Sequence, residues 1–311
     1  MTQDTIGIDI SKDHLDAHRM SDGTSRRFAN DKTGQRALMI WLGKRDTRIV
    51  YEPTGPFHRA LERRLAAAGF ALVKVNPRQA RRFAEATGKL AKTDRMDAAM
   101  LARMGALLEL EARPVRNTTL NDLKDLHMAR EALVKNRTAA KNRAKTLTLA
   151  LLKRQNREQL RQIDRQIEAI ETEIRTLIIS EPDLACRFEI LVSIPGISQI
   201  TAFALLIDMP ELGTLGQGQA ASLTGLAPVT RQSGRWTGRA SIRGGRANVR
   251  QALYIPALVA MRFNPELKAK YAQLIDAGKP PKKAITAIMR KLIILANALI
   301  RDGRKWAPSL P

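Results

Sequence analysis

Apolar and polar positions alternate with two different periods over the first hundred residues. Segments with the composition of short strands occupy residues 6–10, 16–20, 25–29, 48–51 and 71–75. Helical spacing covers about 35–43 and 57–68, where Gly69 is a typical C-terminal stop, and Asn76-Pro77 predicts the start of another helix. This order predicts a strand meander followed by α/β alternation, and therefore a mixed sheet with helices on its faces.

Residues 118–179 contain neither glycine nor proline, and their apolar positions recur every three or four residues. This spacing predicts long helices that pair antiparallel. Between 135 and 157 the chain has no acid and eight basic residues, which are Lys135, Arg137, Lys141, Arg143, Lys145, Lys153, Arg154 and Arg157. Two interpretations fit this charge: a face that binds nucleic acid, or the solvated face of a coiled coil that dimerises.

Glycines become frequent after Glu181-Pro182, and this change predicts a third, compact helical domain. Within it, the sequence LVSIPGIS precedes a helical pattern and resembles a helix-hairpin-helix element, whose turn presents backbone amides to a phosphate. Ser198 stands where a second glycine is usual. A plain turn between two helices is the alternative.

The charge composition indicates which class of molecule the protein binds. Lys and Arg number 53 against 30 Asp and Glu, so the net charge is +23 over 311 residues. Such a chain repels itself unless it meets phosphates, and phosphate binding releases counterions, so nucleic acid is the expected partner. The spread of basic residues argues against a membrane surface, and no apolar run reaches the roughly 20 residues that span a bilayer.

The single cysteine and the N-terminal sequence indicate the cellular compartment of the protein. A single cysteine excludes an internal disulfide and a cysteine-rich zinc site. The N-terminus has no basic region before an apolar stretch, unlike a secretory signal. We therefore expect a cytoplasmic protein.

Four acidic residues are candidates for metal ligands. Asp9 lies inside an apolar strand segment, where an uncompensated carboxylate is costly. Glu52 closes the segment 48–51, and Asp94 and Asp97 are three residues apart, hence on one helix face. Carboxylates from two strands and a helix can converge, and such hard oxygen ligands suit Mg²⁺ or Mn²⁺ bridging a phosphate. The alternative for each acid is a local ion pair or a loop cap.

A second group of candidates lies in the loop 231–250, which has no acid, four glycines and six arginines: Arg231, Arg235, Arg239, Arg243, Arg246 and Arg250. Such a loop can press its backbone against a phosphodiester while guanidinium groups offset developing negative charge. Ser233 precedes Gly234 in this setting, and its hydroxyl can attack phosphorus; Ser241 is the competing nucleophile. Composition does not distinguish a nucleophile from a serine that only contacts phosphate.

Several motifs occur in the order of a known family. They are GIDISK around Asp9, YEPTG around Glu52, KTDRMDA around Asp94 and Asp97, the IPGI turn, LTGLAPVTRQSG with Ser233, and GGRANVRQALY. Together they resemble the DEDD transposases of the insertion sequence 110 family, relatives of the Piv DNA invertases. The resemblance runs from about residue 5 to residue 303.

This resemblance implies three domains. It implies an N-terminal RuvC-like (RNase H-like) catalytic domain over 1–112 and a helical coiled-coil domain over 113–181. A C-terminal α-helical transposase domain would cover 182–311, with the helix-hairpin-helix-like element and the serine loop. The expected fold class is therefore α/β followed by α.

The resemblance also implies chemistry and partners. It places a Mg²⁺-binding tetrad at Asp9, Glu52, Asp94 and Asp97, and a nucleophile at Ser233 that becomes joined to DNA, so that rejoining needs no ATP. The acidic site would assist from a partner subunit. A structured noncoding guide RNA, called a bridge RNA, would pair with donor and target DNA, and the basic coiled coil and the surface of the RuvC-like domain would hold it. Synapsis of two duplexes implies a dimer or tetramer.

Two rival functions remain at this point. A metal-dependent nuclease, such as a junction resolvase, would use the tetrad to activate water while Ser233 only contacts phosphate. A non-enzymatic nucleic-acid-binding protein with a decayed site is the third class.

The expected location is the bacterial cytoplasm, at the nucleoid.

Overall fold

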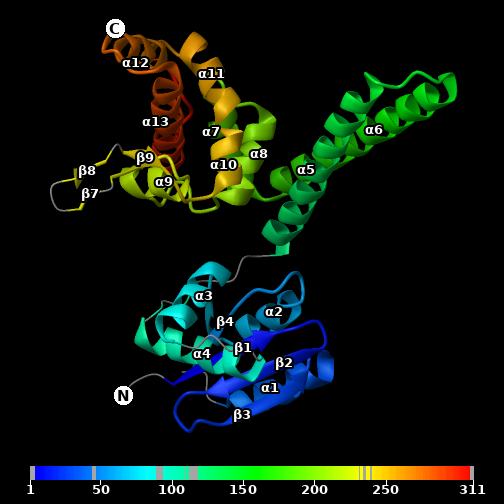
Figure 1. The fold of residues 1–311 in the computed structure, drawn as a ribbon, viewed down its shortest axis with the longest axis vertical. Coiled ribbons are helices and arrows are strands. Elements are labelled where there is room, and N and C mark those ends of the chain that lie inside the picture. The colour runs from blue at the N-terminus through cyan, green and yellow to red at the C-terminus, as the bar shows by residue number, and fades with distance from the viewer. Residues whose placement is uncertain are drawn as a thin grey trace. The chain divides into compact units, whose positions relative to one another are not determined.

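The computed structural model describes residues 4–43, 47–88, 94–108, 110, 112, 118–230, 232–233, 236–238 and 240–308, without the side chains of 94–96, 118, 236 and 237. The chain forms two compact units, Met1–Arg116 and Asn117–Pro311 (Figure 1). Each unit is built around its own hydrophobic clusters.

The N-terminal unit contains a five-stranded mixed sheet in the order β3-β2-β1-β4-β5. Its strands are β1 (Thr5–Ile10), β2 (His14–Arg19), β3 (Ser25–Ala29), β4 (Arg48–Tyr51) and β5 (Ala71–Lys74). The pairs β1–β2 and β2–β3 are antiparallel, and β1–β4 and β4–β5 are parallel. The predicted meander followed by α/β alternation is confirmed.

Helices cover both faces of this sheet. They are α1 (Lys32–Leu42), α2 (Arg59–Ala67), α3 (Pro77–Ala86) and α4 (Asp94–Leu107). Ile6, Ile8 and Ile10 of β1 share a core with Leu38 of α1 and Leu61 of α2. Because side chains alternate along a strand, the residues between these isoleucines point to the opposite face, where the core contains residues of α3 and α4.

In its described residues, the C-terminal unit is helical apart from four short strands. Its helices are α5 (Thr118–Ala144), α6 (Ala150–Ser180), α7 (Pro182–Ser193), α8 (Gln199–Asp208), α9 (Gln217–Leu223), α10 (Ala247–Ala252), α11 (Tyr254–Phe263), α12 (Pro265–Asp276) and α13 (Pro281–Arg301). Leu123 of α5 and Ile174 of α6 belong to the same core as Leu205 of α8 and Leu292 of α13. The long helices therefore pack into the C-terminal helices at one end.

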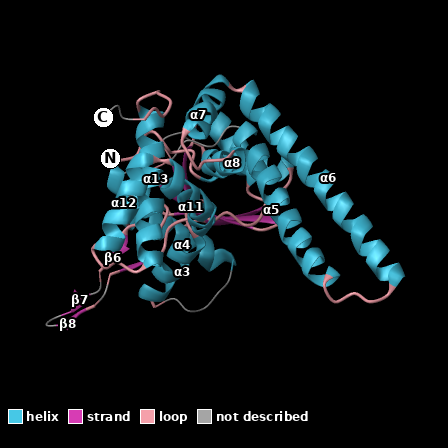
Figure 2. Ribbon diagram, turned by 90° about the horizontal axis from the view of Figure 1, so that it is seen from above, coloured by secondary structure: helices cyan, strands magenta, loops and turns pink. Residues whose placement is uncertain are grey.

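Helices α5 and α6 form an antiparallel hairpin that projects from this core (Figure 2). Arg130 Nε donates to Glu171 Oε1 at 2.7 Å, and farther out Arg137 Nη1 lies 3.3 Å from Asp164 Oδ1. The predicted antiparallel pair of long helices is confirmed. None of the helices in the described part of the chain has the length and apolar character that crossing a bilayer requires.

Between α9 and α10 the chain forms a two-tiered β arm instead of a plain loop (Figure 1). Its lower tier pairs β6 (Pro228–Val229) with β9 (Ser241–Ile242), and its upper tier pairs β7 (Gln232–Ser233) with β8 (Trp236–Thr237). Each strand has two residues, too short for an alternating pattern to show in the sequence. The expectation of an all-helical C-terminal domain missed these strands.

Candidate functional site

The position of α4 on the sheet is set by two glycines. A Cβ atom on Gly7 of β1 would collide with the backbone of Ala98 and Ala102, so only glycine lets the helix lie this close. Gly105, one turn farther along α4, packs against side chains of Thr5 and Val50. The helix therefore runs against the direction of β1 and β4, and its N-terminal end lies where those strands end.

This orientation brings predicted metal ligands to one edge of the sheet. Asp9 is two residues beyond Gly7, on the face that carries α4, and is partly buried. Glu52 immediately follows β4 and is also partly buried. Asp97 lies one turn from the start of α4, next to the close contact at Ala98. Two strand ends and a helix start thus place these three residues at the same edge.

The carboxylates do not close into a compact cluster. No group of three His, Cys, Asp or Glu side chains in metal-binding proximity occurs within the described residues. The side chain of Asp94, the fourth predicted ligand, lies outside them. The donor set nevertheless fits a divalent cation, because Mg²⁺ and Mn²⁺ prefer carboxylate oxygens and bind through only one or two of them together with substrate phosphates.

A buried acid, Asp16, lies beside Asp9. Asp16 of β2 pairs directly with Asp9 across β1 and β2, so both side chains leave the same face of the sheet. Arg27 donates to both Asp16 oxygens, at 2.9 and 3.0 Å. This bidentate pair compensates the buried charge of Asp16. Asp16 was not among the predicted ligands, although its position between the apolar Leu15 and Ala17 was a usable signal.

Asn30 connects the loops that follow the two strands. Its Nδ2 donates to Ser11 O at 2.8 Å, after β1, and to Phe57 O at 3.2 Å, after β4. Gln35 Nε2 donates to Asn30 Oδ1 at 2.9 Å and orients the amide. Asn30 therefore holds together the chain segments that carry Asp9 and Glu52. No local sequence signal marks this role, since the three segments are far apart along the chain.

A second buried network secures the end of β4. Tyr51 Oη donates to Glu62 Oε1 at 2.6 Å, and Lys74 Nζ lies 2.7 Å from the same oxygen. Burial and the neighbouring Glu62 raise the pKa of the Tyr51 phenol well above its usual range. Burial lowers the pKa of His58, which lies 3.5 Å from Glu62 through Nε2. These charge-assisted contacts fix Tyr51, the residue that precedes Glu52.

The serine candidates lie on different tiers of the β arm. Ser233 pairs with Trp236 in the upper tier, and Ser241 pairs with Val229 in the lower tier. Both serines are exposed. In both views the upper tier projects beyond the neighbouring helices (Figures 1 and 2). Ser233 is therefore presented at the outer end of the arm, and Ser241 nearer its base.

Two of the arm's predicted phosphate ligands form hydrogen bonds within the protein, at the base of the arm. Arg246 donates to both carboxylate oxygens of Glu211, at 2.8 and 2.7 Å, and this bond raises the pKa of Arg246. Arg250 Nη1 donates to Gly244 O at 2.8 Å and to Thr224 O at 3.2 Å. Arg243 is exposed. The remaining predicted ligands, Arg231, Arg235 and Arg239, lie outside the described residues.

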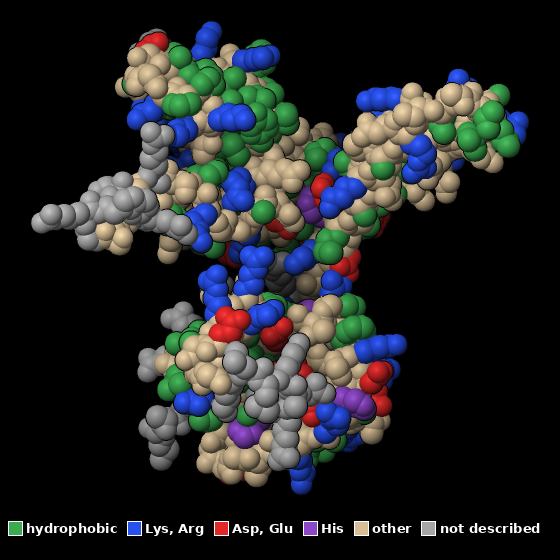
Figure 3. Space-filling model, viewed as in Figure 1, with side chains coloured by type: hydrophobic (Ala, Val, Ile, Leu, Met, Phe, Trp, Pro, Cys, Tyr) green, Lys and Arg blue, Asp and Glu red, His purple; other side chains and the backbone are tan. Residues whose placement is uncertain are grey.

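The basic residues of the helical hairpin lie on its outer part. Lys135, Lys141, Arg143 and Lys145 are exposed, and Arg137 is partly covered by its ion pair with Asp164. The exposed Lys153, Arg154 and Arg157 continue the charge onto α6. In the space-filling view, separate Lys and Arg side chains stand out from this projecting part among other side chains (Figure 3). These exposed charges can contact the phosphates of a polyanion.

The helix-hairpin-helix candidate is a turn between α7 and α8. Gly196 has a φ of 100°, and a Cβ there would meet the backbone of Pro256 and Ala260 in α11. Ser198 caps α8, its Oγ accepting from Thr201 N at 3.3 Å. Packing against α11 thus explains the glycine, and capping explains the serine that replaces the usual second glycine.

Two protein-family models match the chain. The DEDD transposase model of IS110, described as "Transposase", matches residues 6–153. A second model, described as "Transposase IS116/IS110/IS902 family", matches residues 188–272, which include the β arm.

Two similar proteins align with this chain over nearly their whole length. The "Pilin gene-inverting protein" of Moraxella bovis is 29% identical over 319 aligned positions, 98% of each chain, and that of Moraxella lacunata gives the same figures. The "Insertion element IS110 uncharacterized 43.6 kDa protein" of Streptomyces coelicolor is 30% identical over 152 positions, 48% of this chain and 36% of that protein. The family models and the relatives show that the chain is a DNA-recombining enzyme of the divalent-metal-dependent DEDD type, and that it belongs to the IS110 family of transposases.

Proposed function

We propose that the chain exchanges DNA strands through a covalent bond between Ser233 and DNA, assisted by Mg²⁺ held at Asp9, Glu52, Asp94 and Asp97. The observation that carries this proposal is the exposed Ser233 at the outer end of a projecting β arm. The N-terminal unit, with carboxylates at the edge of a mixed sheet, acts as a RuvC-like (RNase H-like) catalytic domain.

The proposed step is a transesterification. The Ser233 oxygen forms a bond to phosphorus, the bond from phosphorus to a deoxyribose oxygen breaks, and the proton of the serine hydroxyl passes to the leaving oxygen. The phosphoester bond is retained in the adduct, so reversal with a different DNA hydroxyl needs no ATP. Mg²⁺ (or Mn²⁺), when bound, stabilises charge on the phosphate oxygens. The exposed Arg243 of the arm stabilises the same charge.

We further propose that a structured noncoding guide RNA selects the donor and target DNA. Two observations support a role of the protein in binding nucleic acid while the RNA selects the sequence. They are the net charge of +23 and the exposed basic residues on the outer part of α5 and α6. Phosphate contacts of this kind fix position without reading bases, so base pairing supplies the specificity. The hairpin would then act as a basic coiled-coil domain, within a dimer or tetramer that acts at the nucleoid.

The test is a denaturing gel that separates a protein–DNA adduct from free cleaved DNA. The protein is co-expressed with the noncoding RNA that flanks its gene, and it is assayed with Mg²⁺ or with a chelator. We expect an adduct from the wild type and from Ser241→Ala, and none from Ser233→Ala, Asp9→Asn or the chelated sample. Omission of the RNA should also abolish it.

A metal-dependent nuclease gives the opposite pattern. Cleaved DNA without an adduct, formed by Ser233→Ala but not by Asp9→Asn, assigns hydrolysis to the carboxylates and reduces Ser233 to a phosphate contact. An adduct that survives Ser233→Ala and disappears in Ser241→Ala moves the nucleophile to the lower tier of the arm.

A further inference from the structure

Four charged side chains form one row across the sheet of the N-terminal unit, on the face that α4 covers. Arg27 of β3 pairs with Asp16 of β2, and Asp16 pairs with Asp9 of β1. The parallel register of β1 with β4, continued by one residue past β4, sets Glu52 beside Asp9. Residues that pair directly across strands point to the same face of a sheet. The row therefore runs from one cation through three carboxylates, two of which are predicted metal ligands.

The cation at the end of the row is bound to the first carboxylate. Arg27 Nε and Nη2 donate to the two oxygens of Asp16, at 2.9 and 3.0 Å. The side chain of Asp16 is 12% exposed and that of Arg27 is 53% exposed, so the carboxylate is enclosed while the guanidinium reaches solvent. Like charges that face each other across two strands repel, as Asp9 and Asp16 do, and Arg27 offsets this repulsion.

Asp16 lies near the predicted metal ligands without completing their coordination shell. Within the described residues, no three acidic, His or Cys side chains lie close enough together to share a metal ion. A carboxylate beside a ligand still attracts a divalent cation, because Coulomb attraction in a partly buried site extends over several ångströms. An arginine in the same row repels the cation for the same reason. The two members of the ion pair therefore have opposite effects on a metal bound at Asp9.

We propose that Asp16 and Arg27 are positioning residues that set the affinity of the carboxylate edge for its divalent cation. Asp16 strengthens metal binding through its negative charge. Arg27 weakens it, because its positive charge stabilises the carboxylates of the metal-free edge and the cation must compete with it. Neither residue belongs to the predicted tetrad. This inference rests on the proposed function, because it requires the metal to bind at Asp9 and Glu52.

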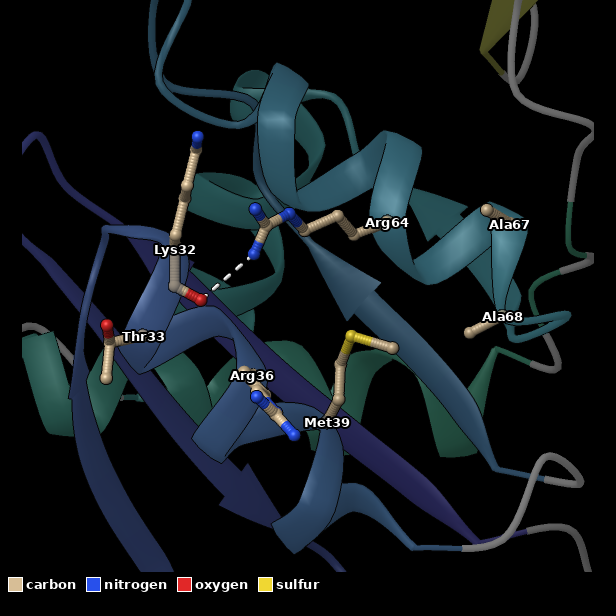
Figure 4. A pocket seen from close by; sticks show the side chains of 7 residues that line it. All are labelled: Lys32, Thr33, Arg36, Met39, Arg64, Ala67 and Ala68. Carbon is tan, nitrogen blue, oxygen red and sulfur yellow. Dashed lines mark hydrogen bonds between the residues drawn. The ribbon is translucent and has the colours of Figure 1, made fainter.

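The opposite face of the sheet does not attract a divalent cation in the same way. Helices α1 and α2 cover that face, and Figure 4 shows the groove between them, with Lys32 and Arg36 on α1 and Arg64 on α2. Among the described residues that line this groove, three are cationic and none is acidic. These charges repel a divalent cation. Cation binding that depends on Asp9 therefore reports on the face that carries the row.

The test is binding of Mn²⁺ alone to the full chain, without nucleic acid, measured by the loss of the electron paramagnetic resonance signal of free Mn²⁺. Binding at the edge is the part that Asp9→Asn removes. We expect Asp16→Asn to bind Mn²⁺ about tenfold more weakly. Arg27→Gln should bind it several-fold more tightly, and Arg27→Lys, which keeps the charge, should bind it as the wild type does.

Each variant has a matched control. Arg26→Gln removes a cation from the neighbouring position of β3, on the opposite face, and Asp4→Asn removes a carboxylate that lies 2.9 Å from Arg19, before the start of β1. Both controls should bind Mn²⁺ as the wild type does. An ion pair that only stabilises the fold predicts weaker Mn²⁺ binding in both Asp16→Asn and Arg27→Gln. Opposite changes in these two variants are specific to an electrostatic effect on the metal.

The outcomes separate this inference from the proposed function. Equal Mn²⁺ affinity in Asp16→Asn, Arg27→Gln and the wild type, or weaker binding in both variants, overturns the inference and leaves the metal site at Asp9 in place. Arg27→Gln decides alone where Asp16→Asn fails to fold, because a gain in affinity requires a folded protein. A wild type without Asp9-dependent binding overturns the proposed metal site, and this inference with it. Normal binding without a Ser233 adduct overturns only the serine chemistry.

Discussion

Gly7 of β1 and Ala98 of α4 touch backbone to backbone, with no space for a side chain on the strand. This contact fixes both the distance of α4 from the sheet and its position along β1. Because Asp9 and Asp97 are each within two residues of the contact, their relative placement depends on it. The geometry of the carboxylate edge is thus set by a residue that has no functional group.

Gly7→Ala should displace α4 and impair the catalytic edge. The added methyl group collides with backbone atoms, which cannot rotate away, so we expect a loss of about 1–3 kcal/mol in unfolding free energy. Formation of the adduct should fall further than the folded fraction does. The control is Gly218→Ala in α9, where a Cβ meets open space and stability should be unchanged or slightly higher. Denaturant unfolding and the adduct gel measure the two effects.

The sheet of the N-terminal unit was predictable because β1, β4 and β5 are short apolar segments and Gly69 marks the end of α2. The side of the sheet on which α4 packs was not predictable, since it depends on a contact between Gly7 and residues ninety positions away. The same limit applies to the arm: the sequence shows six arginines in one loop, and only the fold separates the structural Arg246 from the exposed Arg243. Local charge marks a phosphate-binding segment without assigning each residue in it.

Asn30→Ala should weaken metal-dependent activity more than it weakens folding. The variant loses both hydrogen bonds to Ser11 O and Phe57 O, and the buried Gln35 loses its acceptor. We expect a cost of about 1–3 kcal/mol in stability and a several-fold rise in the Mg²⁺ concentration that gives half-maximal adduct. Asn136→Ala, at an exposed position of α5, is the matched control. An unchanged Mg²⁺ requirement would show that Asn30 does not position the carboxylates.

Replacement by Gln should affect stability at Arg246 and DNA binding at Arg243. Arg246→Gln breaks a bidentate pair with Glu211 and should lower stability by about 1–3 kcal/mol. Arg243→Gln should leave stability unchanged and weaken DNA binding, with a salt slope reduced by about 1. Denaturant unfolding and salt-dependent DNA binding separate the two roles. Equal stability losses in the two variants would contradict the structural assignment of Arg246.

His127 of α5 links the stability of the C-terminal unit to pH. Its side chain is 8% exposed, and Nε2 lies 3.8 Å from Asp208 Oδ2. Burial lowers the pKa of His127, and Arg130 lowers it further, whereas the carboxylates of Asp208 and Glu131 raise it by a smaller amount. The folded state therefore holds this histidine neutral at a pH where the unfolded chain already binds a proton.

Stability should accordingly fall as the pH drops below the unfolded pKa of about 6.5. Below that pH the unfolded chain takes up a proton that folded His127 does not, so unfolding is favoured by up to about 1.4 kcal/mol per pH unit until the folded pKa is reached. His127→Gln should remove this part of the pH dependence, and His14→Gln, at an exposed position, should keep it. Denaturant unfolding at pH 7.5 and pH 5.5 measures the difference. A wild type and a His127→Gln variant with parallel pH profiles would assign the acid sensitivity to other groups.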